Sequence, residues 1–372
     1  MKIALSDLCL PNAGQVKLEP DTLVDYFDIS SVDNISKTVT GYETYPFAEA
    51  PSRARKAVRK NSILVSTVRP NLNSVALFQT ETDNIPVVST GFCVLDCKES
   101  VNPRFVFNFC RSKAFIEDMI SQATGASYPA VSDKIVRAAK IPQYSLEQQN
   151  EITQTLDSVS SIIEARKQQL QKLDELVKAR FVEMFGNPEF NEKGWKTCRL
   201  GDECRVINGR AYKAEELLDD GKYRVLRVGN FFTNDNWYFS DLELDDDKYC
   251  DEGDLLFAWS ASFGPRIWHG EKVIYHYHIW KLADYEHCLN KDFFVELLNY
   301  NCEVMKQGTH GSTMLHFTKS QMEDQQLILP PMELQKQFAD LVGQTDRAKA
   351  TIRKTIDKAQ FLFDSLMQKY FG

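Results

Sequence analysis

Two long stretches of the chain carry apolar residues at the three- and four-residue spacing of a helix. The first runs from Leu146 to Phe185 without glycine or proline, and the second runs from about Met332 to Phe371 after two prolines. Such a stripe is typical of a coiled coil, and forty residues at about 1.5 Å each would reach roughly 60 Å. The apolar residues that we expect at a subunit or helix–helix interface are Leu156, Ile163, Leu170, Leu173, Val177, Phe181, Phe338, Val342, Ile352, Ile356, Leu362 and Leu366.

The two stretches align without a gap when one is shifted by 186 residues. They end alike, as KLDELVKARFVEMFG at Gly186 and KAQFLFDSLMQKYFG at Gly372. In this register Leu176 corresponds to Leu362 and Phe181 to Met367. Identities are few while the spacing is kept, which indicates a duplication.

The segments before the helices repeat more loosely. Residues 61–66 resemble residues 252–258, and N-P-R-F at 102–105 resembles N-K-D-F at 290–293. Alternating runs such as FCVLDC and KVIYHYHIWKL predict strands between glycine and asparagine turns. The prediction is a mixed α/β (α+β) chain with two pseudo-repeated globules and two long antiparallel coiled-coil helices. The expected boundaries are 1–145 for globule 1, 146–186 for helix 1, 187–331 for globule 2 and 332–372 for helix 2.

The alternatives for the helices are docking on their own globules and pairing with another copy of the chain. Packing the two helices against each other is the more economical solution, because each globule is too short to cover its stripe completely.

Composition points to a globular chain in a reducing compartment. Nine cysteines without a CxxC pair argue against a disulfide framework. No apolar run reaches the roughly 18 residues of a membrane helix, and the N-terminus lacks the apolar core of a signal peptide. We therefore expect a cytoplasmic protein that does not engage a membrane.

The net charge of −8 argues only weakly against a nucleic-acid partner, because the charge is unevenly placed. Residues 51–70 hold six basic residues and no acidic one, whereas residues 241–254 hold eight acidic residues and one lysine. A polyanion responds to the local patch more than to the total charge. The bland alternative for residues 51–70 is a solvated helix face.

Catalytic and metal motifs are poorly represented. N-P-E-F at 187–190 superficially resembles a methyltransferase element but lacks its second proline, and its place after a helix end predicts a turn. There is no phosphate-binding loop, no glycine-rich S-adenosylmethionine loop and no convincing nuclease carboxylate cluster. His276 and His278 would share one face of a strand, but no third ligand is suggested by spacing, so groove-lining histidines are favoured over a metal site. We expect no catalytic, cofactor or metal residue in this chain.

Binding loops are better represented. N-G-R-A-Y-K at 208–213 and W-S-A-S-F-G-P-R-I-W at 259–268 combine arginine, aromatic and hydroxyl side chains, which suit phosphate and base-edge contacts but also other polar ligands. The candidate DNA-contacting residues are Arg53, Arg55, Lys56, Arg59, Lys60, Arg69, Ser127, Tyr128, Arg210, Tyr212, Lys213, Arg227, Asn230, Ser260, Ser262, Arg266, His310 and Ser312.

At these residues the chain resembles a specificity subunit of a type I restriction–modification system. The resemblance is carried by PQYSLEQQNEI at 142–152, KQQLQKLDELVKARFVEMFG at 167–186, NGRAYK at 208–213, YRVLRVGN at 223–230 and GDLLFAWSASFG at 253–264. It covers essentially the whole chain, in the order target recognition domain, spacer helix, target recognition domain, spacer helix.

The resemblance implies a non-catalytic DNA reader. Each globule would read one half of an asymmetric bipartite target in double-stranded DNA, and the paired helices would set the unread spacing and dock two methyltransferase subunits. Those subunits and the restriction (motor) subunits would hold the S-adenosylmethionine, ATP and Mg²⁺. A fused restriction–methylation enzyme is disfavoured by the missing motifs. A coiled-coil adaptor without a DNA role is the remaining alternative, and the basic patch counts against it.

Overall fold

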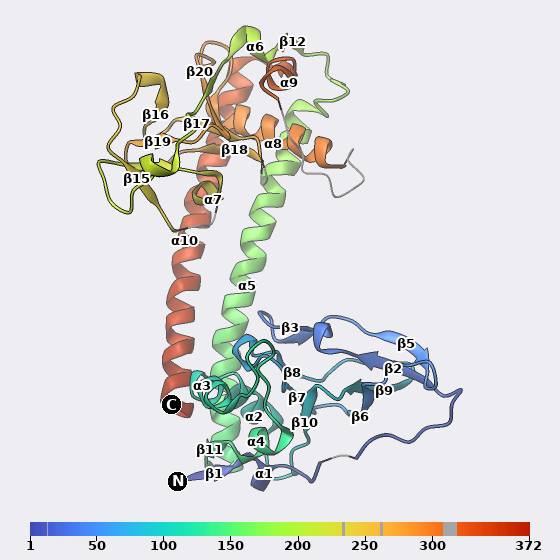
Figure 1. The fold of residues 1–372 in the computed structure, drawn as a ribbon. Coiled ribbons are helices and arrows are strands. Elements are labelled where there is room, and N and C mark those ends of the chain that lie inside the picture. Colours follow the sequence, from blue (N-terminus) through green and yellow to red (C-terminus); the bar gives the residue numbers. More distant parts are fainter. Residues whose placement is uncertain (13, 233–234, 261–262, 308–317) are drawn as a thin grey trace. The chain divides into compact units, whose positions relative to one another are not determined.

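The computed structural model describes residues 1–12, 14–232, 235–260, 263–307 and 318–372 (Figure 1). Its contacts divide the chain into two units. Unit 1 comprises Met1–Lys167 and Arg353–Gly372, whereas unit 2 comprises Gln168–Ile352. Each unit therefore includes part of both long helices.

The two predicted long helices are confirmed. They are α5 (Leu146–Phe185) and α10 (Met332–Phe371), each 40 residues long. Ser145 begins α5 with a reciprocal cap, in which its Oγ accepts from the N–H of Gln148 and its own N–H donates to the Gln148 side chain. At the other end Gly186 takes the left-handed conformation, with φ of 75°, which favours glycine after a helix.

Unit 1 combines small sheets with short helices. Its helices are α1 (Leu5–Leu8), α2 (Pro103–Cys110), α3 (Lys113–Gln122) and α4 (Asp133–Ala138), with 3₁₀ turns η1 (Ile29–Ser31) and η2 (Pro70–Leu72). Its strands are β1 (Lys2–Ala4), β2 (Leu23–Phe27), β3 (Val32–Asp33), β4 (Thr38–Val39), β5 (Glu43–Pro46), β6 (Ala54–Ala57), β7 (Ile63–Ser66), β8 (Val75–Leu77), β9 (Ile85–Ser89), β10 (Phe92–Leu95) and β11 (Lys140–Pro142).

Unit 2 has matching elements. Its helices are α6 (Leu200–Glu203), α7 (Val228–Phe232), α8 (Lys291–Gln307) and α9 (Lys319–Glu323), with 3₁₀ turns η3 (Ala214–Glu216) and η4 (Asp246–Lys248). Its strands are β12 (Lys196–Arg199), β13 (Arg205–Asn208), β14 (Tyr223–Leu226), β15 (Tyr238–Ser240), β16 (Tyr249–Cys250), β17 (Leu255–Ala258), β18 (Gly264–Ile267), β19 (Val273–Tyr275), β20 (Ile279–Ala283) and β21 (Gln326–Leu329).

Sheet topology shows the duplication more clearly than residue identity does. The order β5-β2-β9-β6 in unit 1 is repeated by β15-β14-β19-β16 in unit 2, each with one central parallel pair between two antiparallel ones. The order β10-β7-β8 is likewise repeated by β20-β17-β18, to which β13 is added. The predicted mixed fold with two pseudo-repeated domains is therefore confirmed.

In unit 1 the beginning of α5 shares one apolar core with the end of α10. Ile152, Leu156, Val159 and Ile163 are buried there together with Phe363, Met367 and Phe371, and Ile356 and Leu366 pack against them half-buried. The Phe371 ring lies with its centroid 5.2 Å from that of Phe105 on α2. The end of the second helix therefore completes the core of the first globule.

In unit 2 the roles are exchanged. Val177, Phe181 and Phe185 at the end of α5 are buried with Phe338 and Val342 at the beginning of α10. The Phe185 ring centroid lies 4.7 Å from that of Phe293 on α8. The two helices thus run antiparallel, as predicted, and each Phe-Gly ending closes the core of the globule that belongs to the other repeat.

One predicted interface residue is not buried between the helices. Leu362 is 49% exposed, and Phe363, which is 6% exposed, takes the buried position. Leu176, which the sequence register pairs with Leu362, is also exposed, at 48%. Of the remaining predicted positions, Leu170, Leu173 and Ile352 are half-buried.

A buried glutamine is repeated at the start of both helices. The Gln149 side chain accepts from the N–H of Asn102 at 3.0 Å and donates to the carbonyl of Tyr144 at 3.0 Å. Gln335 accepts from the N–H of Asn290 at 2.8 Å and donates to the carbonyl of Pro330 at 2.8 Å. Both asparagines begin a helix, so this amide joins each long helix to the next helix of its globule. Among the described residues, no helix is long and apolar enough to cross a membrane.

Candidate nucleic-acid interface

A hollow of about 860 Å³ lies in unit 2, where several strands end. It is bordered by the segment that follows β14, by the segment that leads into β15, and by the turn between β19 and β20. Its lining residues are Asp219, Arg227, Val228, Gly229, Asn230, Asp235, Asn236, Trp237, Tyr238, Phe239, His276 and His278. The hollow therefore combines arginine, aromatic, amide and carboxylate side chains.

The N-G-R-A-Y-K segment lies beside this hollow. The N–H of Arg210 donates to the carbonyl of Tyr275, and the carbonyl of Arg210 accepts from the N–H of Tyr277. Position 209 requires glycine, because the backbone passes so close to residues 275 and 276 that a Cβ would overlap the backbone oxygens of Tyr275 and His276. The Tyr212 ring stacks on that of His276, with centroids 6.3 Å apart.

The two predicted arginines of this region differ in availability. Arg210 makes a bidentate ion pair with Glu216, at 2.8 and 2.7 Å, and its guanidinium is thereby held in place. Arg227 lies exposed over the ring of Tyr238, 5.1 Å from its centroid, and has no carboxylate partner among the described residues. An arginine held by an aromatic ring with its donors open suits a phosphate or a guanine edge.

The two histidines of the hollow lie on a turn and not on a strand face as predicted. β19 ends at Tyr275 and β20 begins at Ile279, yet the rings of His276 and His278 still lie close, with centroids 4.9 Å apart. Burial lowers the pKa of His276 to about 4, with smaller contributions from His278 and Arg227. His276 is therefore neutral at physiological pH, so its ring has one donor and one acceptor nitrogen.

The remaining predicted residues of unit 2 are scattered. Lys213 is exposed at the start of η3, the Asn230 side chain donates to the carbonyl of Asn236 at 2.8 Å, and Arg266 lies over the Phe232 ring at 4.9 Å. Ser260 is only 7% exposed, so it is poorly placed for a direct contact with a ligand. Ser262, His310 and Ser312 lie outside the described residues.

The basic run of unit 1 does not form the uniform cationic patch that the sequence suggests, and it is not a helix face either. It covers strand β6 and the segment after it. Lys56 is buried for the most part, and its Nζ binds the carboxylate of Asp133 at 2.6 Å and the carbonyl of Phe92 at 2.6 Å. Arg59 pairs with Asp96 at 3.1 Å. Lys56 is therefore a structural cation.

The other four cations of that run, Arg69 among them, remain outside ion pairs in the described part of the chain. Arg53 and Lys60 are exposed. Arg55 lies over the Phe47 ring, 4.9 Å from its centroid. Arg53, Arg55 and Lys60 remain candidates for contacts with phosphate groups.

A second arginine–tyrosine pair lies on unit 1. Arg69 is exposed in the left-handed conformation, and its guanidinium lies 4.7 Å from the ring centroid of Tyr128, which is 68% exposed. The N–H of Arg69 donates to the carbonyl of Pro129, which ties the two segments together. Ser127 is exposed in the same loop. Each unit thus presents an arginine stacked on a tyrosine, by Arg69 and Tyr128 in one case and by Arg227 and Tyr238 in the other.

Comparison with known protein families identifies the kind of protein that carries these surfaces. The family described as type I restriction modification DNA specificity domain matches residues 19–175 and again residues 192–359. The chain belongs to this family. It is a DNA specificity subunit of a type I restriction–modification system, and its part in such a system is specificity and not catalysis.

Individual relatives agree with the family match. The chain is 24% identical over 339 residues to the type I restriction enzyme MjaIX specificity subunit of Methanocaldococcus jannaschii, covering 83% of this chain and 76% of the relative. It is 25% identical over 167 residues to the type I restriction enzyme EcoBI specificity subunit of Escherichia coli, covering 43% of this chain and 35% of the relative.

Two solved structures share the fold. One comes from a study of complex assembly and conformational transition of the type I R-M system, with a TM-score of 0.64, 24% identity, and coverage of 100% of this chain and 97% of that one. The other is the S subunit of a type I system from M. genitalium, with a TM-score of 0.58, 15% identity, and coverage of 100% and 96%.

In this specificity subunit four residues that line the hollow lie outside the predicted DNA contact set. Trp237 and Tyr238 were not among the candidates, although the run N-W-Y-F at 236–239 is unusually aromatic. The sequence predicts His276 and His278 as groove-lining residues but gives no sign of a DNA contact. The aromatic density of N-W-Y-F at 236–239 and of H-Y-H at 276–278 is the sequence signal that points to all four.

Proposed function

We propose that each unit of this specificity subunit reads one half of an asymmetric, bipartite DNA target. The support is that the two units repeat one topology with different side chains at corresponding surfaces. Different side chains would read different base sequences, since sequence is read by contacts to base edges. The arginine–tyrosine pairs Arg69–Tyr128 and Arg227–Tyr238 are our first candidates for the contact surfaces.

The paired helices would act as a ruler between the half-sites. Readers of divided targets need a fixed spacing between their reading elements, and two antiparallel helices of 40 residues supply a stiff element of defined length. Their exposed apolar residues would also receive partner subunits. Ile162, Leu176, Val182, Phe361 and Leu362 are each between 44% and 76% exposed.

The partners would be two methyltransferase subunits and the restriction (motor) subunits of the system. S-adenosylmethionine, ATP and Mg²⁺ would be bound by those partners and not by this chain. The expected compartment is the cytoplasm, where the DNA target of a type I system lies. A coiled-coil adaptor without DNA reading is not favoured by the family match.

The experiment is a matched shortening of both helices. One heptad is removed from α5 and the opposing heptad from α10, beside the ion pair between Lys349 and Asp174, which join at 2.6 Å. Seven residues shorten a helix by about 10 Å, which corresponds to roughly 3 base pairs of duplex. N6-methyladenine is then mapped in DNA from cells that carry the chain with its methyltransferase partner.

We expect the same two half-sites with a spacer shortened by about 3 base pairs. A variant that lacks only the heptad of α5 is the control, because it breaks the pairing of the helices and should lose methylation. Methylation of the original target with unaltered spacing by the doubly shortened chain would refute the ruler.

A further inference from the structure

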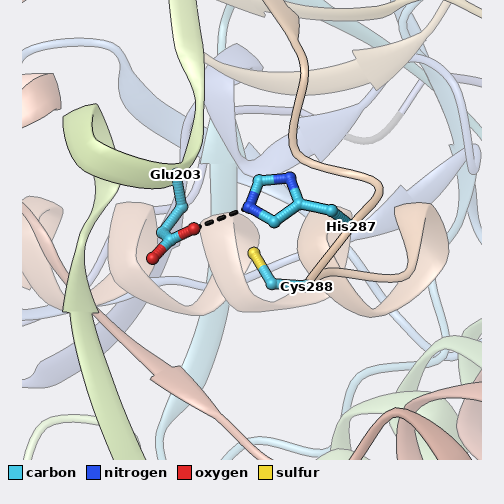
Figure 2. Close-up of side chains that lie close together, drawn as sticks. All are labelled: Glu203, His287 and Cys288. Atoms are coloured by element: carbon cyan, nitrogen blue, oxygen red, sulfur yellow. Dashed lines mark hydrogen bonds and ion pairs between the residues drawn. The ribbon is translucent and has the colours of Figure 1, made fainter.

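Unit 2 carries a cluster of three metal-binding side chains away from the hollow. Glu203 ends α6, and His287 and Cys288 lie in the segment between β20 and α8 (Figure 2). One ligand atom from each residue lies within 4.8 Å of the other two, which no other such group does in the described part of the chain. The His287 Nε2 and a carboxylate oxygen of Glu203 are 2.6 Å apart.

The histidine ring is oriented as in a metal site. Its Nδ1 lies 2.9 Å from the carbonyl oxygen of Asp284. A carbonyl can only accept, so Nδ1 carries a proton. Without an ion, Nε2 also carries a proton and donates it to the Glu203 carboxylate, and a zinc ion would replace that proton. Metal-ligating histidines are held by this kind of hydrogen bond through their second nitrogen.

We propose that Glu203, His287 and Cys288 form a binding site for a zinc ion. One carboxylate oxygen, one imidazole nitrogen and one thiolate suit Zn²⁺, which accepts oxygen, nitrogen and sulfur ligands in tetrahedral geometry. Ligands at zinc bonding distance are about 3.4 Å apart, so the Glu203–His287 pair would open slightly to admit the ion. The exposure of the two side chains, 30% and 57%, allows that movement and leaves the fourth position to water.

The ion has a path to the site. Glu203 and His287 line an open hollow of about 370 Å³. Asp202 and Glu323 lie in the same lining, where each is paired with a basic side chain, so the hollow gives access to the ion without a net attraction. Bound zinc would join the end of α6 to the segment that leads into α8, and would therefore brace the first elements of unit 2.

The fold itself does not require this cluster, because unit 1 makes the same corner without it. Helix α1 ends at Leu8 where α6 ends at Glu203. If the helix-capping residues Asn102 and Asn290 are aligned, Glu99 and Ser100 stand where His287 and Cys288 stand in unit 2. The three ligands are thus a feature of one repeat only, which is expected of an added site and not of a shared folding element.

The test uses the full chain after removal of metal by a chelator. Zn²⁺ is titrated by calorimetry, and Co²⁺ is added as a spectroscopic probe of sulfur ligation. We expect one Zn²⁺ per chain, a sulfur-to-cobalt charge-transfer band, and loss of that band in Cys288→Ser. His287→Ala should weaken zinc binding about tenfold or more. If Cys288→Ser should fail to fold, the sulfur is sought instead in the X-ray absorption spectrum of the zinc-loaded wild type.

A matched control is present in the same unit. His269 Nδ1 contacts a Glu252 oxygen at 2.9 Å, but that pair belongs to no three-ligand group among the described residues. His269→Ala should leave zinc affinity unchanged, and so should Cys97→Ser in unit 1. The proposal is overturned if the wild type binds zinc no better than His287→Ala, if His269→Ala loses as much affinity as His287→Ala, or if the absorption spectrum shows no sulfur.

Discussion

Replacement of Phe371 by alanine near the end of α10 is expected to destabilise the N-terminal unit of the chain. The Phe371 side chain is fully buried in unit 1, with ring centroids 5.2 Å from Phe105 and 6.0 Å from Phe109. Truncation of a buried phenylalanine to alanine costs about 3–5 kcal/mol. We take about 3 kcal/mol here, because the last turn of a helix can relax into part of the space.

Hydrogen exchange followed by mass spectrometry locates this loss. A loss of about 3 kcal/mol accelerates exchange through local opening by about 100-fold. The acceleration should fall on α2 and on the beginning of α5. Hydrogen exchange in α8 should not change, because the side chain that packs against α8 is Phe185 and not Phe371.

The control lies on the same helix. Phe361 is 76% exposed, so Phe361→Ala removes an aromatic side chain from α10 without opening a core. Faster exchange in unit 2 alone, or equal effects of Phe371→Ala and Phe361→Ala on α2, would refute the assignment of Phe371 to the core of unit 1.

Three further predictions concern unit 2. Gln335→Leu should cost about 3 kcal/mol of stability in denaturant unfolding, because it leaves buried backbone donors and acceptors without partners, whereas Gln337→Leu on the exposed face should cost little. Arg227→Ala should weaken DNA binding by the assembled methyltransferase, and the slope of log binding constant against log salt concentration should fall by about one. Arg205→Ala, which removes a surface ion pair outside the hollow lined by Arg227, should change neither quantity. His276 has a folded pKa of about 4, below its unfolded value of 6.5, so the unfolded chain binds more protons between these values and stability falls as pH falls through that window. His276→Gln should flatten the fall measured by thermal unfolding between pH 6.5 and 4, and an unchanged slope would contradict the burial of this ring.

The two long helices were the most predictable elements, because their apolar periodicity continues over forty residues. Forty residues with a sustained apolar stripe can hardly be anything but helix, and α5 and α10 have the predicted extent. The shift of 186 residues was readable because a helix keeps its register even after most identities are lost. The sheets were readable only as pairs of similar runs, and the parallel pairing of β2 with β9 and of β14 with β19 could not be derived from them.

The apolar stripe of α10 differs from its buried face at one position for a reason inherent in helices. A true repeat of 3.6 residues drifts against any regular three-four spacing, so adjacent apolar residues compete for the inward position. In F-L-F at 361–363 the structure buries only Phe363. The helical phase places Phe363 in the core of unit 1 that Phe371 also fills, while Phe361, with the same ring, stays exposed.

Charged side chains were the least predictable because their partners are distant in sequence. Lys56 looks like a surface cation until Asp133, 77 residues away, is placed beside it. The proposed zinc ligands are hard to predict for the same reason. Glu203 and His287 are 84 residues apart and meet only when β12 and α6 fold onto the segment after β20.

Exchange of helix ends accounts for the repeated Phe-Gly ending. If α5 closed its own globule, its last phenylalanine would lie near Phe105. It instead packs on Phe293 of unit 2, while Phe371 packs on Phe105 of unit 1. Each globule therefore depends on a helix that starts in the other repeat, and the two apolar endings must fit two pockets built to one pattern. This constraint preserves Phe-Gly at both ends while the surface residues of the two units are free to diverge. If the two halves read different DNA sequences, as we propose, the shared core contacts and the divergent surfaces serve separate functions.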